Sequence, residues 1–338
     1  MIDLCKCKPP LYLAILILTC LFFVSCLTPM AAQTRSPSEL VELVPIDVDP
    51  KQPERKNFGS LKLLSAFQLQ SKDKRFGGLS GLAIGIDGKL YAVSDNGYWL
   101  SARMEIDSNG ALLNLADWRI APILTSTKTP VAGSLRDAEA LARERDGSFL
   151  VAFEGVHRIW RYNAPPDTFD STPSPLPTPS AIAQAPANGG IEGLTVLPDD
   201  RLLILTEELA NPDKSFKGWI MNNGRFEELS YLPAPGFRVT DCAALANGDV
   251  LVLERRYVPL GRLSTRLTLV KAQDIHPGAR LIGQELLKLE QPLAAENFEG
   301  LAVQRNFNST IIFIVSDDNY SSFQQTLLLQ FLLADGEN

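Results

Sequence analysis

Acidic and hydroxyl residues recur at two fixed places in five similar stretches of this chain. The first place comes just before a short apolar run and holds Ser80, Glu139, Glu192, Asp241 and Glu299. The second place comes just after the next apolar run and holds Asp95, Glu154, Glu207, Glu254 and Asp317. Because the two sets keep nearly the same spacing, one of them should form a ring if the five stretches pack around an axis.

A ring of carboxylates favours a bound cation. Carboxylates gathered in one place repel each other, and their pKa values rise unless a positive charge neutralises them. Oxygen ligands from several directions suit Ca²⁺, whereas only two histidines are available for a zinc site built on imidazole. We therefore expect Ca²⁺, with the ligands drawn from Glu139, Glu192, Asp241, Glu299 and Asp95.

Two other roles for the acidic residues remain open. Each carboxylate could instead cap backbone N–H groups or pair with an arginine of the neighbouring stretch, as architectural residues of repeats do. If the two sets have different roles, we expect the residues of the first set to be functional and those of the second set to be structural.

Arginines accompany the acidic residues. Arg136 and Arg238 each lie three residues before a member of the first set, and Arg255 directly follows Glu254. Guanidinium groups beside a bound cation could bind an anionic substrate such as a phosphate ester through paired hydrogen bonds. The alternative is a structural lattice of arginine and carboxylate between the repeats.

Other reactive residues carry weaker signals. Ser80 precedes a β-run rather than a helix, so it does not match the nucleophile elbow of serine hydrolases. His157 lies in the sequence HRIWRY, which reads as an outer strand, and we expect a packed or exposed strand residue rather than a general base. Cys242 should be a small buried residue. Asn308 begins a match to the N-glycosylation acceptor pattern.

The five stretches predict the fold class. Successive members of the first set lie 49 to 59 residues apart, which is the length of a propeller blade with generous loops. Asp-Gly, Asp-Asp or Asn-Gly turns separate apolar runs such as LYAVS and FLVAF, which are typical of strands buried on both faces. We predict an all-β protein, a five-bladed β-propeller closed by an N-terminal strand that completes the last blade. Six blades remain an alternative.

The N-terminal segment predicts export. Residues 1–32 read as a signal peptide because basic residues precede an apolar run from Leu11 to Val24, about 14 residues long. Cleavage near Ala32 competes with a lipoprotein signal that ends before Cys26. Residues 33–57 are expected to be a flexible tether, and residues 58–335 the propeller. The protein should therefore be periplasmic, anchored to the cell envelope by a lipid at Cys26, or secreted.

Composition limits the partners. The formal net charge is −7 and no cluster of lysine and arginine occurs, so nucleic acid is not expected as a partner. A membrane would be contacted only through a lipid at Cys26. Only Cys242 lies outside the targeting segment, which excludes a disulfide within the propeller. We expect a monomer acting on a small anionic ester.

The motifs, taken in order, resemble a known family. FGGLSGL followed by YAVSDNG, then DAEAL, VAFEG, IEGL, LVLERR and NFEGLAV are similar to the phytase-like β-propellers described as "esterase-like activity of phytase", over about residues 58–335. The resemblance implies a propeller, a location outside the cytoplasm and hydrolysis of phosphate or other esters. Glu139, Glu192 and Glu299 match the family's repeated glutamate, whereas Ser80 and Asp241 depart from it.

Three functions follow from these observations. The first is a Ca²⁺-dependent phosphoesterase with Glu192, Glu139 and Glu299 as catalytic residues and Arg136, Arg238 and Arg255 as substrate-binding residues. The second is a carboxylesterase or lactonase that uses the same cation on a carbonyl group. The third is a non-catalytic envelope module whose Ca²⁺ only stiffens the ring.

Overall fold

The computed structural model describes residues 40–258, 262–306 and 309–334, all within the unit Glu39–Asn338. These residues form 23 strands and four short 3-10 helices, without an α-helix. No helix in this part of the chain is long and apolar enough to cross a membrane. The predicted signal peptide, Cys26, the cleavage site near Ala32 and Asn308 lie outside the described residues.

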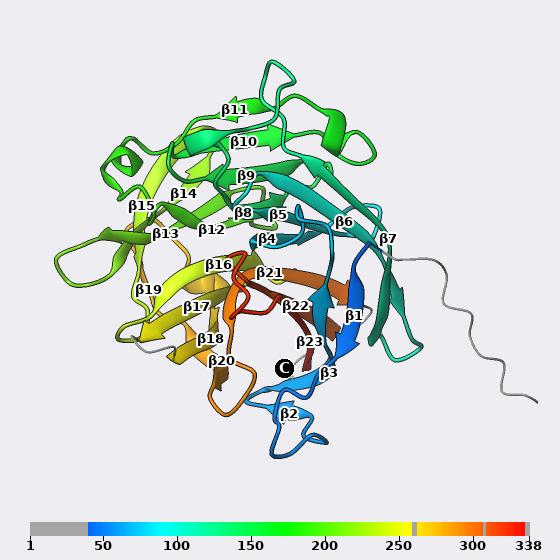
Figure 1. The fold of residues 1–338 in the computed structure, drawn as a ribbon. Helices are drawn as coiled ribbons and strands as arrows, with labels where there is room; N and C mark the ends of the chain where they lie inside the picture. Colours follow the sequence, from blue (N-terminus) through cyan, green and yellow to red (C-terminus); the bar gives the residue numbers. More distant parts are fainter. Residues whose placement is uncertain (1–39, 259–261, 307–308, 335–338) are drawn as a thin grey trace, which may run out of the picture. The chain divides into compact units, whose positions relative to one another are not determined.

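Five sheets surround a common centre, and one edge strand of each sheet is innermost (Figure 1). The innermost strands are β4 (Leu79–Ile84), β8 (Ala138–Arg143), β12 (Ile191–Val196), β16 (Arg238–Ala244) and β21 (Asn297–Asn306). Each contacts the innermost strand of the next blade, and β21 contacts β4, so the ring closes. The prediction of a five-bladed propeller is confirmed, and the alternative of six blades is wrong.

The first four blades are antiparallel sheets of consecutive strands. The first adds β5 (Leu90–Ser94), β6 (Tyr98–Ile106) and β7 (Leu112–Pro122) to β4. The second adds β9 (Phe149–Phe153), β10 (Arg158–Tyr162) and β11 (Ser174–Leu176) to β8. The third adds β13 (Leu202–Ala210), β14 (Phe216–Asn222) and β15 (Arg225–Tyr231) to β12, and the fourth adds β17 (Val250–Val258), β18 (Arg262–Val270) and β20 (Gln284–Glu290) to β16. A short strand, β19 (Arg280–Leu281), pairs in parallel with β15.

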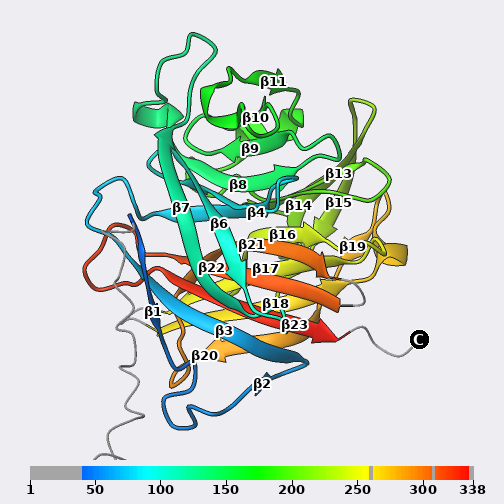
Figure 2. The same cartoon turned by 90° about the vertical axis from the view of Figure 1, so that its right-hand side faces the viewer.

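The fifth blade combines the two ends of the described chain. It contains β21, β22 (Ser309–Asp317), β23 (Leu327–Ala334), then β3 (Leu61–Gln70) and β1 (Glu42–Pro45), while β2 (Asn57–Phe58) pairs with β3. Figure 2 shows β3 beside β23, and β1 pairs with the other edge of β3. The predicted closure by an N-terminal strand is confirmed.

The segment 40–57 is not a tether, contrary to the expectation for residues 33–57. Leu43 of β1 pairs with Leu69 of β3 in an antiparallel register, and the side chains of Val41 and Val48 are buried. An unpaired edge of β3 would leave its backbone groups exposed, and β1 covers that edge. This segment is rich in charged residues and prolines, so its sequence did not indicate that a few apolar side chains attach it to the propeller.

The remaining elements are short connections. The 3-10 helices are η1 (Gly133–Leu135), η2 (Thr168–Asp170), η3 (Ser180–Gln184) and η4 (Ala272–Asp274). Two of them, η2 and η3, flank β11, so the loop rich in proline and serine after β10 supplies only the short outer strand of the second blade.

The core lies between neighbouring sheets. Every residue of β5 and β9 is buried, as expected for strands covered on both faces. The rings of Trp99 and Tyr162 meet edge to face with centroids 5.3 Å apart, and Trp99 also stacks on Phe169 at 5.9 Å. Such pairs add about 0.5–1.5 kcal/mol beyond the burial of their apolar area. These contacts hold the first blade against the second and thereby fix the strands that carry the acidic residues.

Candidate functional site

Each innermost strand carries a register shift at the same place near its start. The residue that each shift leaves out of the pairing is, blade by blade, Ser80, Glu139, Glu192, Thr240 and Glu299. A bulge of this kind redirects one side chain out of the alternating pattern of a strand. The sequence analysis assigned Asp241 to the first set in the fourth blade. The backbone register shows that Thr240 occupies that place instead.

The second set is displaced by one residue in the same blade. The strand partner of Val239 is Glu254, whereas the corresponding partners in the first and second blades are Ser94 and Phe153. The corresponding partners in the third and fifth blades are Thr206 and Ser316. From the first blade to the fifth, the residue that follows the partner is Asp95, Glu154, Glu207, Arg255 and Asp317. A slip of one residue turns a side chain to the opposite face of a strand. Arg255 thus occupies the place of a carboxylate in the fourth blade.

Asp241 and Glu254 have structural roles. Oδ1 of Asp241 accepts a hydrogen bond from the Cys242 amide at 2.7 Å, and Oδ2 accepts one from the Leu301 amide at 2.7 Å. Glu254 accepts a hydrogen bond from the Tyr231 hydroxyl and pairs with Arg266 at 2.6 Å. Burial raises the pKa of Asp241. Asp241, predicted to be a metal ligand, is a tie between β16 and β21, and Cys242 is buried as expected.

Replacing Asp241 with alanine is expected to destabilise the fold by about 2–6 kcal/mol without changing cation affinity. The variant leaves two buried amides unpaired, and each such loss costs roughly 1–3 kcal/mol. Urea unfolding measures the change, with Asp47→Ala as a control because Asp47 is exposed. A variant that kept its stability and lost cation affinity would restore Asp241 as a ligand.

The corrected sets meet at one end of the propeller centre. We call the charged residues of both sets, together with Asp137, the acidic mouth; its members are Asp95, Asp137, Glu139, Glu154, Glu192, Glu207, Arg255, Glu299 and Asp317. The charges of Glu139, Glu154, Glu207 and Glu299 all act on Glu192, and those of Asp95 and Glu299 act on Asp317. The expected division between a functional first set and a structural second set is wrong, because both sets line the same mouth.

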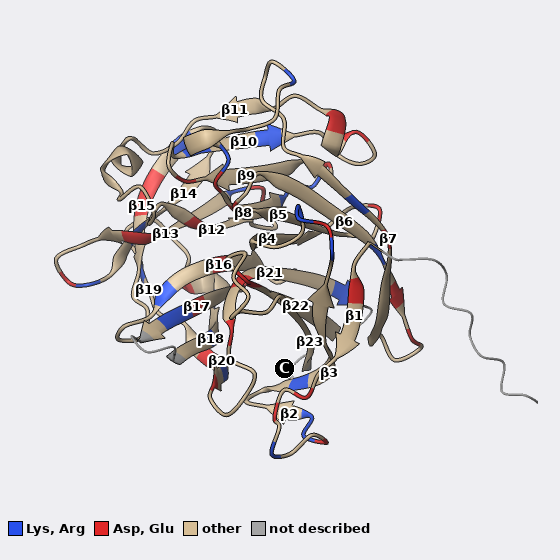
Figure 3. Cartoon of the chain, in the orientation of Figure 1, with Lys and Arg blue, Asp and Glu red and all other residues tan. Residues whose placement is uncertain are grey.

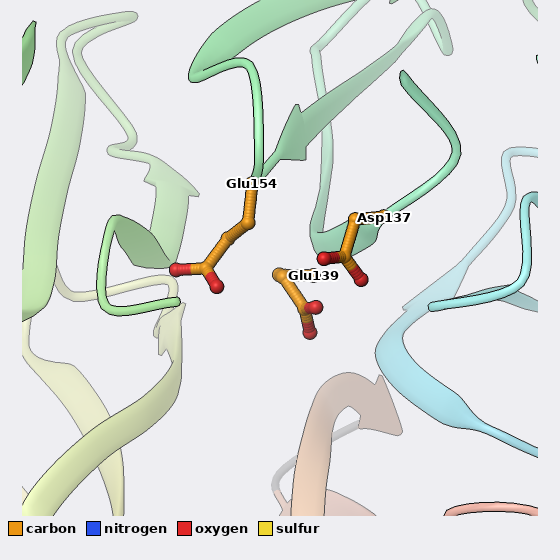
Figure 4. A group of neighbouring side chains, drawn as sticks. All are labelled: Asp137, Glu139 and Glu154. Atoms are coloured by element: carbon orange, nitrogen blue, oxygen red, sulfur yellow. The ribbon is translucent and has the colours of Figure 1, made fainter. Parts of the chain in front are cut away.

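Three carboxylates of the second blade converge within the acidic mouth. Oxygen atoms of Asp137, Glu139 and Glu154 all lie within 4.8 Å of one another (Figure 4). Asp137 directly precedes β8, Glu139 lies in β8, and Glu154 directly follows β9. Oε1 of Glu154 accepts hydrogen bonds from the amides of Gly189, at 2.7 Å, and Gly190. Backbone donors of the third blade therefore hold this carboxylate in place.

Burial and mutual repulsion raise the pKa values of these carboxyl groups. Burial, with the charges of Asp137 and Glu299, raises the pKa of Asp95 to about 7. Burial also raises the pKa of Glu154 to about 7, although the Gly190 and Gly189 amides oppose the shift. The pKa values of Glu139 and Glu192 rise well above the ordinary range for the same causes, burial first. Near neutral pH some of these carboxyl groups are therefore protonated for part of the time.

The donor set fits a hard divalent cation. The ligating atoms are carboxylate oxygens from several directions, and a cation would relieve the repulsion that raises their pKa values. Oδ1 of Asp95 is buried and has no hydrogen-bond partner among the described residues. Among those residues no lysine or arginine pairs with Asp137, Glu139 or Glu154 within 4.0 Å.

Arg255 neutralises the other side of the acidic mouth. Its guanidinium donates to Glu299 at 2.5 Å, to Glu207 at 3.2 Å and to the side-chain oxygen of Asn297. The predicted role of Arg255 in substrate binding is therefore replaced by that of an internal counterion. The arginine–carboxylate lattice, which the sequence left open, exists here between the third, fourth and fifth blades. Asp137, Glu139 and Glu154, which we call the second-blade group, have no such partner among the described residues.

The two remaining arginines differ in their availability. Arg136 is exposed, and its charge lowers the pKa of Asp95, which places it beside the acidic mouth. No hydrogen bond or ion pair of the Arg136 guanidinium occurs within the described part of the chain. The guanidinium of Arg238 lies 4.9 Å from the ring centre of Phe216 and 3.6 Å from Glu208. Elsewhere basic and acidic residues are interspersed over the blades (Figure 3).

The cation-free protein is expected to lose stability as pH rises from about 5 to about 9. Burial raises the pKa values of Asp95 and Glu154 to about 7 and that of Asp317 to about 9. The folded state then binds more protons than the unfolded state, so the stabilisation is complete below the unfolded pKa values and disappears as pH passes the folded ones. Urea midpoints in EDTA would show the fall, and excess Ca²⁺ should flatten it. A midpoint that rises over this range would contradict the mutual repulsion described above.

Sequence reasoning missed one member of this site and one residue beside it. Asp137 precedes Glu139 by two residues in DAEAL, and this spacing on a strand would have placed both carboxylates on one face. His157, which lies beside Glu154 at Gly190 rather than in the acidic mouth, carried no periodic signal because it belongs to a turn between strands.

The chain is similar to one known family and to several solved structures. The family model "Phytase-like: Esterase-like activity of phytase" matches residues 74–320. No curated protein matches the chain. Among solved structures, a PQQ-bound aldose sugar dehydrogenase from Streptomyces coelicolor is 14% identical, with a TM-score of 0.45 and coverage of 82% of this chain and 99% of that one. A luciferin-regenerating enzyme is 11% identical, with a TM-score of 0.42 and coverage of 78% and 94%.

Proposed function

Because this chain belongs to the phytase-like family, esterase-like activity of phytase, we propose that it is a cation-dependent hydrolase of esters, with phosphate esters as the preferred class. The observation that carries the proposal is the second-blade group. Asp137, Glu139 and Glu154 bring oxygen atoms within 4.8 Å of one another, without a pairing lysine or arginine among the described residues. A structural lattice would have supplied such a partner, as Arg255 does for Glu207 and Glu299.

The residues of the acidic mouth divide into distinct roles. Asp137, Glu139 and Glu154 would hold the cation, which when bound supplies Lewis-acid polarisation of the ester and a more acidic water. Arg136, exposed at the edge, is available to bind the anionic group of the substrate through paired hydrogen bonds. Glu299 is held by Arg255 and contributes to the frame of the mouth rather than to the chemistry.

Glu192 is the residue best suited to move a proton. It is buried, and burial with the charges of Glu139, Glu154 and Glu207 raises its pKa well above the ordinary range. A carboxyl group that keeps its proton near neutral pH can protonate a leaving alcohol. In the reverse direction its carboxylate can take up a proton from water.

We propose Ca²⁺ as the cation and a location outside the cytoplasm. An all-oxygen donor set drawn from strand ends and loops is compatible with the loose geometry of Ca²⁺, and extracellular Ca²⁺ sites work at millimolar concentrations. Export follows from the predicted signal sequence, with periplasmic, lipid-anchored and secreted forms all compatible with it. We propose a monomer, because the ring closes within one chain.

The test is a comparison of ester classes with purified full-length protein. Phytate, a chromogenic phosphate monoester, a short-chain carboxylester and a lactone are each incubated with Ca²⁺ or with EDTA. Turnover of the phosphate esters only in Ca²⁺ is the expected result. Turnover of the carboxylester or lactone alone would change the substrate class. Absence of turnover, together with a Ca²⁺-dependent rise in melting temperature, would replace the enzyme by a binding module.

A further inference from the structure

His157 has a fixed orientation at the border of the acidic mouth. The residue lies in the turn that joins β9 to β10, and its Nε2 is 2.9 Å from the carbonyl oxygen of Pro186. A carbonyl oxygen only accepts hydrogen bonds, so Nε2 must carry the proton and Nδ1 must present its lone pair. The tautomer of neutral His157 is thus determined by its neighbour.

The ring of His157 lies beside Gly190, at a position where the second blade carries the side chain of Asp137. Gly190 has the position in the third blade that Asp137 has in the second. The backbone carbonyl of Asp137 accepts a hydrogen bond from the Glu154 amide, and that of Gly190 accepts one from the Glu207 amide. A Cβ on Gly190 would lie 2.4 Å from Nδ1 of His157 and 3.2 Å from Oε1 of Glu154. Nδ1 is therefore within 5.6 Å of that carboxylate oxygen. The absence of a side chain at Gly190 lets the imidazole enter.

Nδ1 of His157 is a buried acceptor without a donor. Within the described part of the chain no N–H or O–H lies at hydrogen-bonding distance from it. An unpaired buried acceptor costs free energy that an ordinary structural histidine avoids by exposure or pairing. The nearest member of the acidic mouth with a measured relation to Nδ1 is Glu154, and a ligand with an O–H group beside it would satisfy the lone pair.

We propose that His157 positions the water that attacks the ester, by accepting a hydrogen bond from its O–H group at Nδ1. The inference rests on the proposed function and adds a residue to it. Pro186 holds the ring through Nε2, Gly190 makes room for the ring, and Oε1 of Glu154 lies within 5.6 Å of Nδ1. A water that donates one O–H to Nδ1 keeps its oxygen lone pairs free to attack. The expectation from sequence, that His157 is only a packed or exposed strand residue, is replaced by this role.

Two substitutions separate this role from simple anchoring. His157→Gln places an amide N–H near the position of Nε2, so it keeps the bond to Pro186 but has no acceptor at Nδ1. His157→Asn places a carbonyl oxygen near Nδ1 and lacks the bond to Pro186. We expect kcat for the best ester to fall at least about tenfold in the Gln variant, with KM nearly unchanged, and less in the Asn variant. Full kcat in the Gln variant, or a larger loss in the Asn variant, would overturn the proposal.

Two further measurements keep the result independent of turnover. Ca²⁺ affinity by calorimetry should stay within about twofold of the wild type in both variants, because His157 is not in the cation-holding group. ¹⁵N spectra of the imidazoles are simple, since the chain has only two histidines. His276→Gln assigns them, and His157 should show a bare Nδ1. A proton on Nδ1 in the neutral ring would overturn the proposal even if the enzyme is active. An inactive wild-type protein would overturn the proposed function, and this role with it.

Discussion

Replacing Glu139 with glutamine is expected to lower both Ca²⁺ affinity and ester turnover by at least about 100-fold, while the fold is kept. Glu139 belongs to the second-blade group, and an oxygen of its carboxylate lies within 4.8 Å of an oxygen of Asp137 and of Glu154. An amide presents one oxygen without a full negative charge, so the cation loses its strongest attraction. Isothermal titration with Ca²⁺ and kcat/KM for the best ester measure the two losses.

The sign of the stability change makes this experiment decisive. In EDTA at about pH 8 the Glu139→Gln variant should unfold at the same or higher urea concentration than the wild type, because a repelling charge has been removed. In excess Ca²⁺ it should be the less stable protein, because the wild type gains the free energy of binding. Glu227→Gln is the matched control, since Glu227 is an exposed glutamate of β15. A variant that retained Ca²⁺ affinity would move the cation away from the second-blade group.

The fold could be predicted because several independent patterns pointed to one architecture. The turns at Gly88, Gly147 and Gly248 adopt positive φ angles of 75°, 91° and 87°, as Asp-Gly and Asn-Gly hairpins require. The apolar runs after them are buried on both faces, and the spacing of the repeats gave the number of blades. The strand β1 could not be predicted, because its attachment depends on pairing with β3 rather than on its own composition.

The site was predicted only in part, because its geometry depends on a bulge that sequence does not display. The sequence comparison matched Asp241 and Glu254 to the carboxylates of the other blades by residue type. The backbone register puts Thr240 and Arg255 there instead. One residue of displacement is enough to turn a side chain from the mouth to the sheet interior. Residue type was thus a misleading guide in the one blade where the repeat exchanges a carboxylate for a guanidinium.

Replacing Arg255 with methionine is expected to cost about 3–5 kcal/mol of unfolding free energy in EDTA at neutral pH. Methionine keeps the apolar stem but leaves the carboxylates of Glu207 and Glu299 without their counterion, and removing one partner of a buried pair has a cost of this size. The side chains of Glu207 and Glu299 are only 13% and 12% exposed, so water screens them poorly. Urea unfolding at constant ionic strength measures the loss. Arg103→Met is the control, because Arg103 and its partner Asp117 are 48% and 68% exposed, and it should change little.

A second substitution shows whether the loss comes from repulsion. In the Arg255→Met background, Glu299→Gln removes one of the unpaired charges and should restore a substantial part of the lost stability. The single variant should also recover stability as pH falls, because removing the guanidinium raises the pKa values of Glu207 and Glu299 further above their unfolded values. If Arg255→Met were as stable as the wild type at neutral pH, Arg255 would not be the counterion of this side. There would then be no physical reason for an external cation to bind the second-blade group rather than Glu207 and Glu299.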